Sequence, residues 1–297
     1  MRKFSVAKVQ GTGNDFVLLD NSAGEHLPFA ALARLWCERR FGIGADGLLV
    51  LEAPTSGEAG IGMRIFNADG TEAEMCGNGI RCIARYLEHT RAGSPSAITV
   101  QTASGLVRVR RAVRDGADVV AVDMGVPRFA KAEIPMRGDP DARAIDELVE
   151  VPGWAPVRIC AVSMGNPHCV TFLDTPVERA DIAAHAASLA ALDLFPNGAN
   201  FEIAHVSGGS LNMRVLERGV GETQACGSGA CAVGVSAILT GRATSPLDVH
   251  MPGGSVSIEW PGPGASVEMA GPAEIVFFAE ISVPDEILTG AHAPANA

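Results

Sequence analysis

The sequence MRIFNADGTEAEMCGNG, residues 63–79, is matched 150 residues later by MRVLERGVGETQACGSG, residues 213–229. Met, Arg, Glu, Cys and two glycines coincide without a gap, and Ile/Val and Phe/Leu exchange within one class. A second pair of segments, GTGNDFVLLD at 11–20 and MGNPHCVTFLD at 164–174, occurs in the same order at nearly the same offset. Two such blocks predict an internal duplication rather than two unrelated glycine-rich turns.

Both halves have the hydrophobic pattern of small α/β domains. Helical periodicity marks residues 29–39 and 79–89, and residues 229–241 are apolar nearly all round, which indicates a deeply buried helix. Alternating or β-branched runs predict strands at residues 3–9, 15–20, 47–52, 63–67, 97–102, 106–111, 156–163, 169–174, 201–206, 211–217, 256–260, 266–270 and 273–283. We therefore expect an α/β (α+β) fold of two pseudo-symmetric halves, each a mixed sheet wrapped around a central helix, with the active site in the cleft between them. The pattern does not choose between a barrel and an open sheet.

The duplication also sets the expected domain boundaries. A segment rich in Pro, Gly and charge at residues 122–142 marks the joint. We expect an N-terminal half at residues 1–124 and a C-terminal half at residues 125–271. The last strand and the tail, residues 272–297, are expected to return to the first half.

Composition and charge exclude several classes of protein. The chain has 297 residues, 47% of them hydrophobic, a net charge of −11 and a pI near 5.1, which disfavours a nucleic-acid partner. No apolar run approaches the length of a membrane span, and no signal peptide is evident, so a cytoplasmic protein with no membrane partner is expected. The seven cysteines lack zinc-like spacing, which indicates free thiols and no metal site.

Two of these cysteines have special surroundings. Cys76 and Cys226 each stand directly before Gly-polar-Gly and a predicted helix. A partly buried helix N-terminus favours a negative charge by up to ~2 kcal/mol, or roughly one and a half pKa units, which brings a thiol from ~8.5 to about neutrality. Two thiols facing one another would not both ionise, because the first charge opposes the second. We expect one thiolate and one thiol.

A thiolate paired with a thiol fits a two-base racemase or epimerase that needs no cofactor. One sulfur removes a proton from a carbon and the other delivers a proton to the opposite face. Backbone N–H groups at the two helix starts would hold a carboxylate and stabilise the developing enolate-like charge; they belong to Gly77, Asn78, Gly227 and Ser228. Two other readings of the pattern are a redox switch that closes a Cys76–Cys226 disulfide, and a phosphate or nucleotide site. The second is disfavoured because Arg81 is the only basic residue beside either turn. Cys82 and Cys231 fall inside the helices and are expected in the core.

The motifs resemble those of the diaminopimelate epimerase family. The resemblance extends from residue 8 to the terminal strands. It rests on the segments GTGNDFVLLD, GIGADGLL, FNADGTEAEMCGNGIRC, GNPHCV, NFE and ERGVGETQACGSGACA. It implies two pseudo-symmetric α/β halves and an enzyme that interconverts LL- and meso-diaminopimelate without a cofactor, for the synthesis of lysine and peptidoglycan precursors.

The resemblance also implies roles for individual residues. Cys76 and Cys226 match the two acid/base cysteines, while His168 and Glu217 match groups that support them near the thiols. The implied substrate-binding residues are Asn14, Asn67, Gly77, Asn78, Asn166, Asn200, Glu217, Arg218, Gly227 and Ser228. The Arg218 guanidinium can bind a distal carboxylate through two hydrogen bonds. The asparagine amides can hydrogen-bond the ammonium and carboxylate groups at the distal end of the substrate. We give Asp46 no role beyond shaping its loop.

Two alternative functions remain open from the sequence. A proline-type racemase uses a similar pair of cysteines, but it has no need for a distal pocket that contains Glu217 and Arg218. A thiol redox switch would depend on oxidant and not on an amino acid. For either enzyme we expect a small-molecule substrate and a homodimer.

Overall fold

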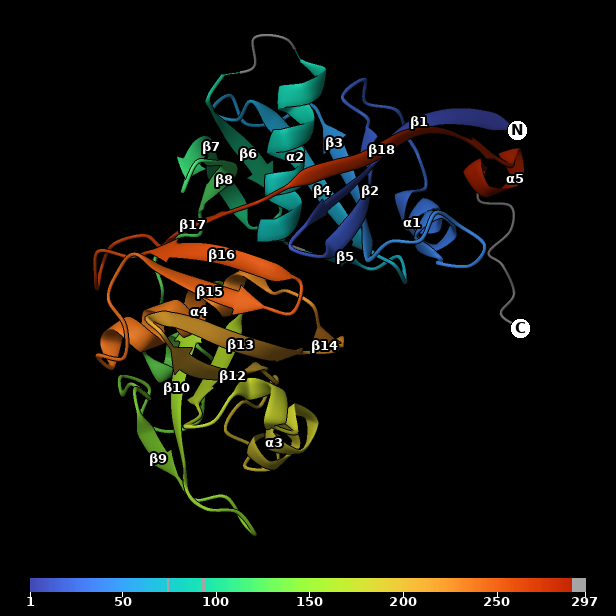
Figure 1. The fold of residues 1–297 in the computed structure, drawn as a ribbon. Helices are drawn as coiled ribbons and strands as arrows, with labels where there is room; N and C mark the ends of the chain where they lie inside the picture. The colour runs from blue at the N-terminus through green and yellow to red at the C-terminus, as the bar shows by residue number, and fades with distance from the viewer. Residues whose placement is uncertain (74, 92–94, 290–297) are drawn as a thin grey trace. The chain divides into compact units, whose positions relative to one another are not determined.

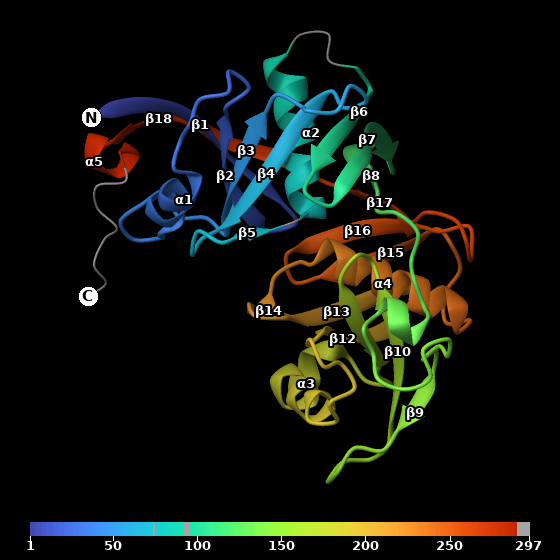
Figure 2. The ribbon, with the colours of Figure 1, turned by 180° about the vertical axis from the view of Figure 1, so that it is seen from behind.

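The computed structural model describes residues 1–73, 75–91 and 95–289, which form two compact units. Unit 1 contains Met1–Val122 and the chain from Pro272 onward, and unit 2 is Asp123–Gly271. Figure 1 and Figure 2 show each unit from opposite sides. Residues 290–297, which the sequence placed with the first half, lie outside the described residues.

Unit 1 is built on a mixed sheet in the order β18–β1–β2–β3–β4–β6–β7–β8. The β2/β3 and β4/β6 pairs are parallel and the others are antiparallel, with the short β5 beside β4. The strands are β1 (Arg2–Gly11), β2 (Asn14–Asp20), β3 (Gly47–Glu52), β4 (Ile61–Asn67), β5 (Glu72–Ala73), β6 (Ala97–Thr102), β7 (Gly105–Arg114), β8 (Ala117–Asp123) and β18 (Glu274–Val283).

Unit 2 repeats this topology in the order β9–β10–β11–β12–β13–β15–β16–β17. The parallel pairs are now β11/β12 and β13/β15, and the short β14 lies beside β13. The strands are β9 (Glu147–Val149), β10 (Val157–Ser163), β11 (Pro167–Phe172), β12 (Asn200–Ser207), β13 (Ser210–Glu217), β14 (Gly221–Thr223), β15 (Leu247–Met251), β16 (Gly254–Glu259) and β17 (Glu268–Gly271). The predicted mixed α/β fold is confirmed, and the sequence repeat corresponds to a repeat of strand order.

Each unit places one long helix after its short strand. Helix α2 (Gly77–Thr90) contacts β1, β2, β7 and β18, and α4 (Gly227–Leu239) contacts β10–β13, β15 and β16. Strands therefore surround α4, which explains why its sequence is apolar nearly all round. The remaining helices are α1 (Phe29–Cys37), α3 (Ile182–Ala190), α5 (Asp285–Leu288) and the 3-10 turns Lys131–Glu133 and Val177–Arg179. The sequence analysis missed α3, because its alanine-rich sequence gives little contrast between faces.

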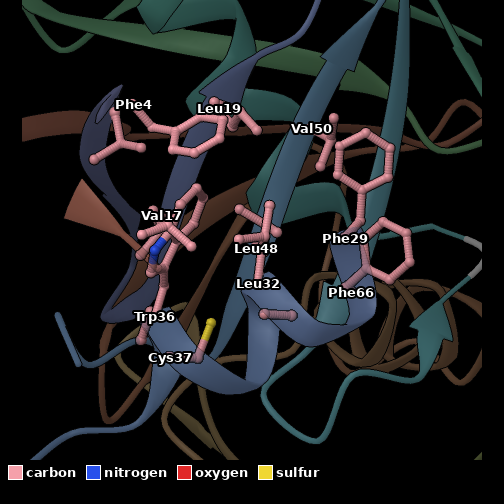
Figure 3. Close-up of a cluster of buried hydrophobic side chains, with 14 residues drawn as sticks. Phe4, Val17, Leu19, Phe29, Leu32, Trp36, Cys37, Leu48, Val50 and Phe66 are labelled. Carbon is pink, nitrogen blue, oxygen red and sulfur yellow. The ribbon is translucent and has the colours of Figure 1, made fainter. Parts of the chain in front are cut away.

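A cluster of buried side chains fixes α1 on the sheet of unit 1. Figure 3 shows Leu32 and Trp36 of the helix facing Val17 and Leu48 of the strands. The Trp36 ring is 1% exposed and meets the Phe4 ring edge-on at 5.8 Å between centroids. Trp36 therefore contributes to the contact between the helix and the sheet that carries the residues of the site.

Replacement of Trp36 by alanine should lower the free energy of unfolding by about 3–5 kcal/mol, because the lost apolar contacts leave a cavity. The measurement is urea denaturation followed by far-UV circular dichroism. Trp154→Ala is the matched control, since Trp154 is 48% exposed, and should change the free energy by less than about 1 kcal/mol. Equal effects of the two substitutions would contradict the assignment of Trp36 to the core.

Candidate active site

Both predicted acid/base cysteines are the residues that cap the long helices. Cys76 and Cys226 have extended backbone dihedrals, with φ of −146° and −128°, so each chain enters its helix directly after the cysteine. The Sγ atom of Cys76 accepts the N–H of Gly79 at 3.5 Å, and Sγ of Cys226 accepts that of Gly229 at 3.4 Å. The predicted position at a helix start is confirmed for both, and this hydrogen bond favours the thiolate form.

The half-site of unit 1 is organised by Asn14, at the start of β2. Its Oδ1 atom accepts from the thiol of Cys76 at 3.7 Å and from Nδ2 of Asn78 at 3.3 Å. Its Nδ2 atom donates to Asp46 at 2.7 Å, which fixes which way the amide points. Asp46 therefore orients Asn14, a role that the sequence analysis did not assign. The side chain of Asn67, at the end of β4, donates to Thr71.

Arg81 is fully buried although it follows the first glycine turn closely. Its Nε donates to the carbonyl of Pro272 at 3.1 Å, and its Nη2 donates to Thr12 Oγ1 at 3.1 Å. The guanidinium thus joins α2 to the β1–β2 turn and to the returning C-terminal segment. It serves the packing of unit 1, which weakens the phosphate-site reading further.

In unit 2 a chain of hydrogen bonds joins β11 to β12. His168 is fully buried, its Nδ1 lies 2.6 Å from Oε1 of Glu202, and its Nε2 lies 2.9 Å from Oδ1 of Asn166. Glu202 is also fully buried, and its Oε1 lies 3.0 Å from where a Cβ on Gly229 would stand. The pair therefore occupies the space beside the first turn of α4, behind Cys226.

Asn200 joins Pro167 on β11 to Arg218, which directly follows β13. Its Nδ2 donates to the carbonyl of Pro167 at 3.2 Å, and its Oδ1 accepts the backbone N–H of Arg218 at 2.9 Å. The Arg218 guanidinium donates to the carbonyl of Asn197. Glu217 accepts from the hydroxyl of Thr223. The charge of Glu217 also acts on Cys226, which directly precedes Gly227 and Ser228 of α4, so these residues of unit 2 lie near one another.

The environment of Cys226 corrects the expectation of a near-neutral thiol. Burial raises the pKa of Cys226 well above its usual value, and the charge of Glu217 raises it further. Hydrogen bonds from Ser228, whose Oγ lies 3.5 Å from Sγ, and from Gly229 act in the opposite direction but are the smaller effects. The helix terminus alone predicted a thiolate, whereas the whole environment holds Cys226 as a thiol at neutral pH.

Glu202 is the residue of this site that sequence reasoning passed over. It stands two positions after Asn200, on the same face of β12, and its neighbours Phe201, Ile203 and Ala204 are apolar. A lone acidic residue inside an apolar segment was the available signal, because a buried carboxyl needs a partner.

The prediction that Cys82 and Cys231 lie in the core is confirmed, since both are 0% exposed.

The described residues contain no group of three or more His, Cys, Asp or Glu side chains placed to hold a metal ion. Among the same residues, no helix has the length and apolarity needed to cross a bilayer. All seven cysteines are free thiols.

The model of the family described as "Diaminopimelate epimerase" matches residues 6–130 and 160–276. The chain belongs to this family. It is 45% identical over 273 residues to the diaminopimelate epimerase of Desulforudis audaxviator, covering 91% of this chain and 96% of that one. It is also 45% identical over 259 residues to the Moorella thermoacetica enzyme of that name, covering 85% and 90% of the two chains.

Solved structures of other families share the fold of this family member. A phenazine biosynthesis protein of the PhzF family from Bacillus anthracis superposes with a TM-score of 0.70 at 16% identity, covering 95% of this chain and all of that one. A hydroxyproline epimerase from Agrobacterium vitis gives a TM-score of 0.65 at 15% identity, with 95% and 91% coverage. At such identities the likeness concerns the fold alone.

The charge of Glu217 makes a testable contribution to the pKa of Cys226. Glu217→Gln should lower the pKa of Cys226, so that iodoacetamide alkylates it roughly tenfold faster at a fixed mildly alkaline pH for each pKa unit of the shift. Peptide mass spectrometry measures the rate at Cys226 alone. Glu259→Gln removes the same charge from an exposed position on β16 and should leave the rate unchanged. An unaltered rate in Glu217→Gln would contradict the electrostatic role.

Proposed function

We propose that the protein epimerises LL-diaminopimelate to meso-diaminopimelate, and the reverse, by proton transfer between two cysteines and the α-carbon. Membership of the family supports this substrate. The observation that carries the mechanism is the duplicated cap, with one cysteine sulfur on the first-turn N–H of a helix in each unit. The proposal includes a role in lysine and peptidoglycan precursor synthesis, and no cofactor.

Two sulfurs are proposed because inversion at carbon needs a base on one face and an acid on the other. Cys76 and Cys226 take these roles and exchange them when the reaction reverses. Backbone N–H groups of Gly77, Asn78, Gly227 and Ser228 are proposed to hold the α-carboxylate, where the charge of the carbanion develops. The dipoles of two helix starts favour this negative charge.

The distal amino-acid head is proposed to bind to polar side chains beside the cysteines. Arg218 would pair with its carboxylate, because a guanidinium binds a carboxylate through two parallel hydrogen bonds. Asparagine side-chain amides can accept hydrogen bonds from an ammonium and donate them to a carboxylate. The asparagines proposed for this role are Asn14, Asn67, Asn166 and Asn200. Glu217 also binds at this end and, with His168, supports the acid/base cysteines. Such a site rejects a substrate without the second head, since its polar groups would be left unpaired.

Serine at either cysteine position should nearly abolish epimerisation while the fold is retained, because a serine hydroxyl is a far weaker acid/base group than a thiol. The assay follows solvent deuterium entering the α-carbon of diaminopimelate, with no cofactor added. Proline serves as the control substrate and should exchange no deuterium. Exchange into proline would favour the proline-type racemase.

Oxidised protein tests the redox-switch alternative in the same assay. A Cys76–Cys226 disulfide would occupy both acid/base groups, so oxidation should stop exchange and a thiol reductant should restore it. Undiminished turnover by Cys226→Ser, or by fully oxidised protein, would contradict the two-base proposal.

We propose further that the protein is a cytoplasmic homodimer. Seven free thiols fit a reducing compartment. In the described part of the chain β18 pairs with β1 alone among the strands of unit 1, and it exposes Val276, Phe277 and Phe278 by 56%, 43% and 50%. An exposed apolar edge strand is a site of association unless it is covered. We propose that a second copy of this chain packs against this edge of β18 and covers it.

Val276→Glu should shift the dimer towards monomer, because it introduces a charge into the apolar strip without touching the core. Analytical ultracentrifugation over a range of protein concentrations measures the shift. Val113→Glu is the matched control, since Val113 on β7 is 70% exposed and lies outside the strip. A monomeric wild-type protein, or equal behaviour of the two variants, would contradict this interface.

A further inference from the structure

Glu202 and His168 form a polar pair at a place where the fold accepts an apolar one. His168 on β11 lies opposite Asn200 in the parallel register, as Phe16 on β2 lies opposite Gly47. With the two sheets in register, Phe16 and Leu49 of unit 1 therefore correspond to His168 and Glu202 of unit 2. Phe16 and Leu49 are 2% and 0% exposed. The repeated architecture is thus satisfied by hydrocarbon at this position, and the polar pair in unit 2 requires another explanation.

The second repeat places the pair beside the helix start that carries the acid/base sulfur. A Cβ on Gly79 would meet Leu49 Cδ2 at 2.9 Å, and a Cβ on Gly229 would meet Glu202 Oε1 at 3.0 Å. The side chain behind the first helical turn is therefore apolar in unit 1 and carboxylic in unit 2. Among the described residues, only the unit 2 side chain at this position is hydrogen-bonded to a histidine. That histidine, His168, also contacts Asn166.

The hydrogen bonds of His168 determine where its protons lie. An amide oxygen cannot donate, so Nε2 must carry the proton that it shares with Asn166 Oδ1. The 2.6 Å contact between Nδ1 and Glu202 Oε1 requires one further proton between those two atoms. Either the ring is neutral and accepts from a carboxylic acid, or it is an imidazolium that donates to a carboxylate. Both forms have the same number of protons.

The surroundings favour the neutral form. Glu202 is fully buried, and its Oε2 has no hydrogen-bond partner among the described residues, which is far more costly for a carboxylate than for a carboxylic acid. Burial raises the pKa of Glu202, and the charge of Glu217 raises it too, while His168 lowers it. The other titratable neighbours that interact with it are the thiols of Cys169 and Cys226, which supply no positive charge.

We propose that Glu202 is a positioning residue that donates its carboxylic proton to Nδ1 of His168, and so fixes the direction of the Asn166 amide. The neutral ring then holds Asn166 Oδ1 through Nε2–H, which leaves the Nδ2 group of Asn166 to donate to a substrate carboxylate. The inference rests on the proposed function for the identity of that substrate. A neutral pair also keeps a second carboxylate charge away from Cys226, whose ionisation the reaction needs.

The form of the pair can be observed directly by NMR. In ¹⁵N-histidine-labelled protein, a long-range proton–nitrogen spectrum at neutral pH should show His168 with a bare Nδ1 and a protonated Nε2. The signals of His168 are identified by their loss in His168→Phe. A doubly protonated ring, or a ring protonated at Nδ1 alone, would overturn the proposal.

Three variants test the function of the pair. Glu202→Gln keeps a neutral donor for Nδ1, so it should keep the tautomer, the pH profile and kcat/KM within about threefold. Glu202→Leu removes the donor and should raise KM for diaminopimelate by about tenfold, with a smaller change in kcat. The double variant His168→Phe/Glu202→Leu copies the pair of unit 1 and should fold as stably as the wild type while showing the same rise in KM.

The outcomes separate this inference from the proposed function. If Glu202→Gln loses as much activity as Glu202→Leu, or shifts the pH profile, the carboxylate charge is required and the proposal is wrong. If the double variant binds substrate normally, the pair has no positioning role. If wild-type protein fails to exchange deuterium into diaminopimelate, the proposed function fails, whereas the NMR spectrum still decides the tautomer.

Discussion

The hydrogen bond from a first-turn N–H to a cysteine sulfur is the constraint around which both half-sites are built. A helix terminus favours a negative charge by up to ~2 kcal/mol, yet burial and the charge of Glu217 outweigh it at Cys226. At Cys76 the thiol donates to Asn14 Oδ1, an interaction that only the protonated sulfur can make. Each unit therefore offers a sulfur that the backbone can stabilise as an anion, and the two sulfurs differ in their side-chain neighbours.

The duplication keeps this backbone constraint and changes the side chains around it. The strand order, the short strand and the cysteine cap recur in both units. Leu49 behind one helix start is replaced by Glu202 behind the other, and Asn67 at the end of β4 by Glu217 at the end of β13. The two sulfurs thus have the same local backbone geometry in different electrostatic surroundings.

The sequence predicted those parts of the structure that depend on local pattern. The long helices, their cysteine caps and most strands follow from periodicity and from the repeat, whereas α3 was missed because its alanines leave little amphipathic contrast. The high pKa of Cys226 was not predictable, because desolvation and the approach of Glu217 depend on tertiary packing. The role of Asp46 was missed for a similar reason, since nothing local shows that its carboxylate reaches the amide of Asn14.

A buried polar group in this protein points to a functional role when the packing of the fold does not explain its burial. Arg81 joins three segments of unit 1, so its burial is explained by packing. Glu202 has no such structural reason, because the equivalent position in the other unit is leucine and its second oxygen has no partner among the described residues. A costly carboxyl beside Cys226, with hydrocarbon at the equivalent position beside Cys76, supports the proposed positioning role of Glu202. The contrast between equivalent positions of an internal repeat therefore supplies a control within one molecule.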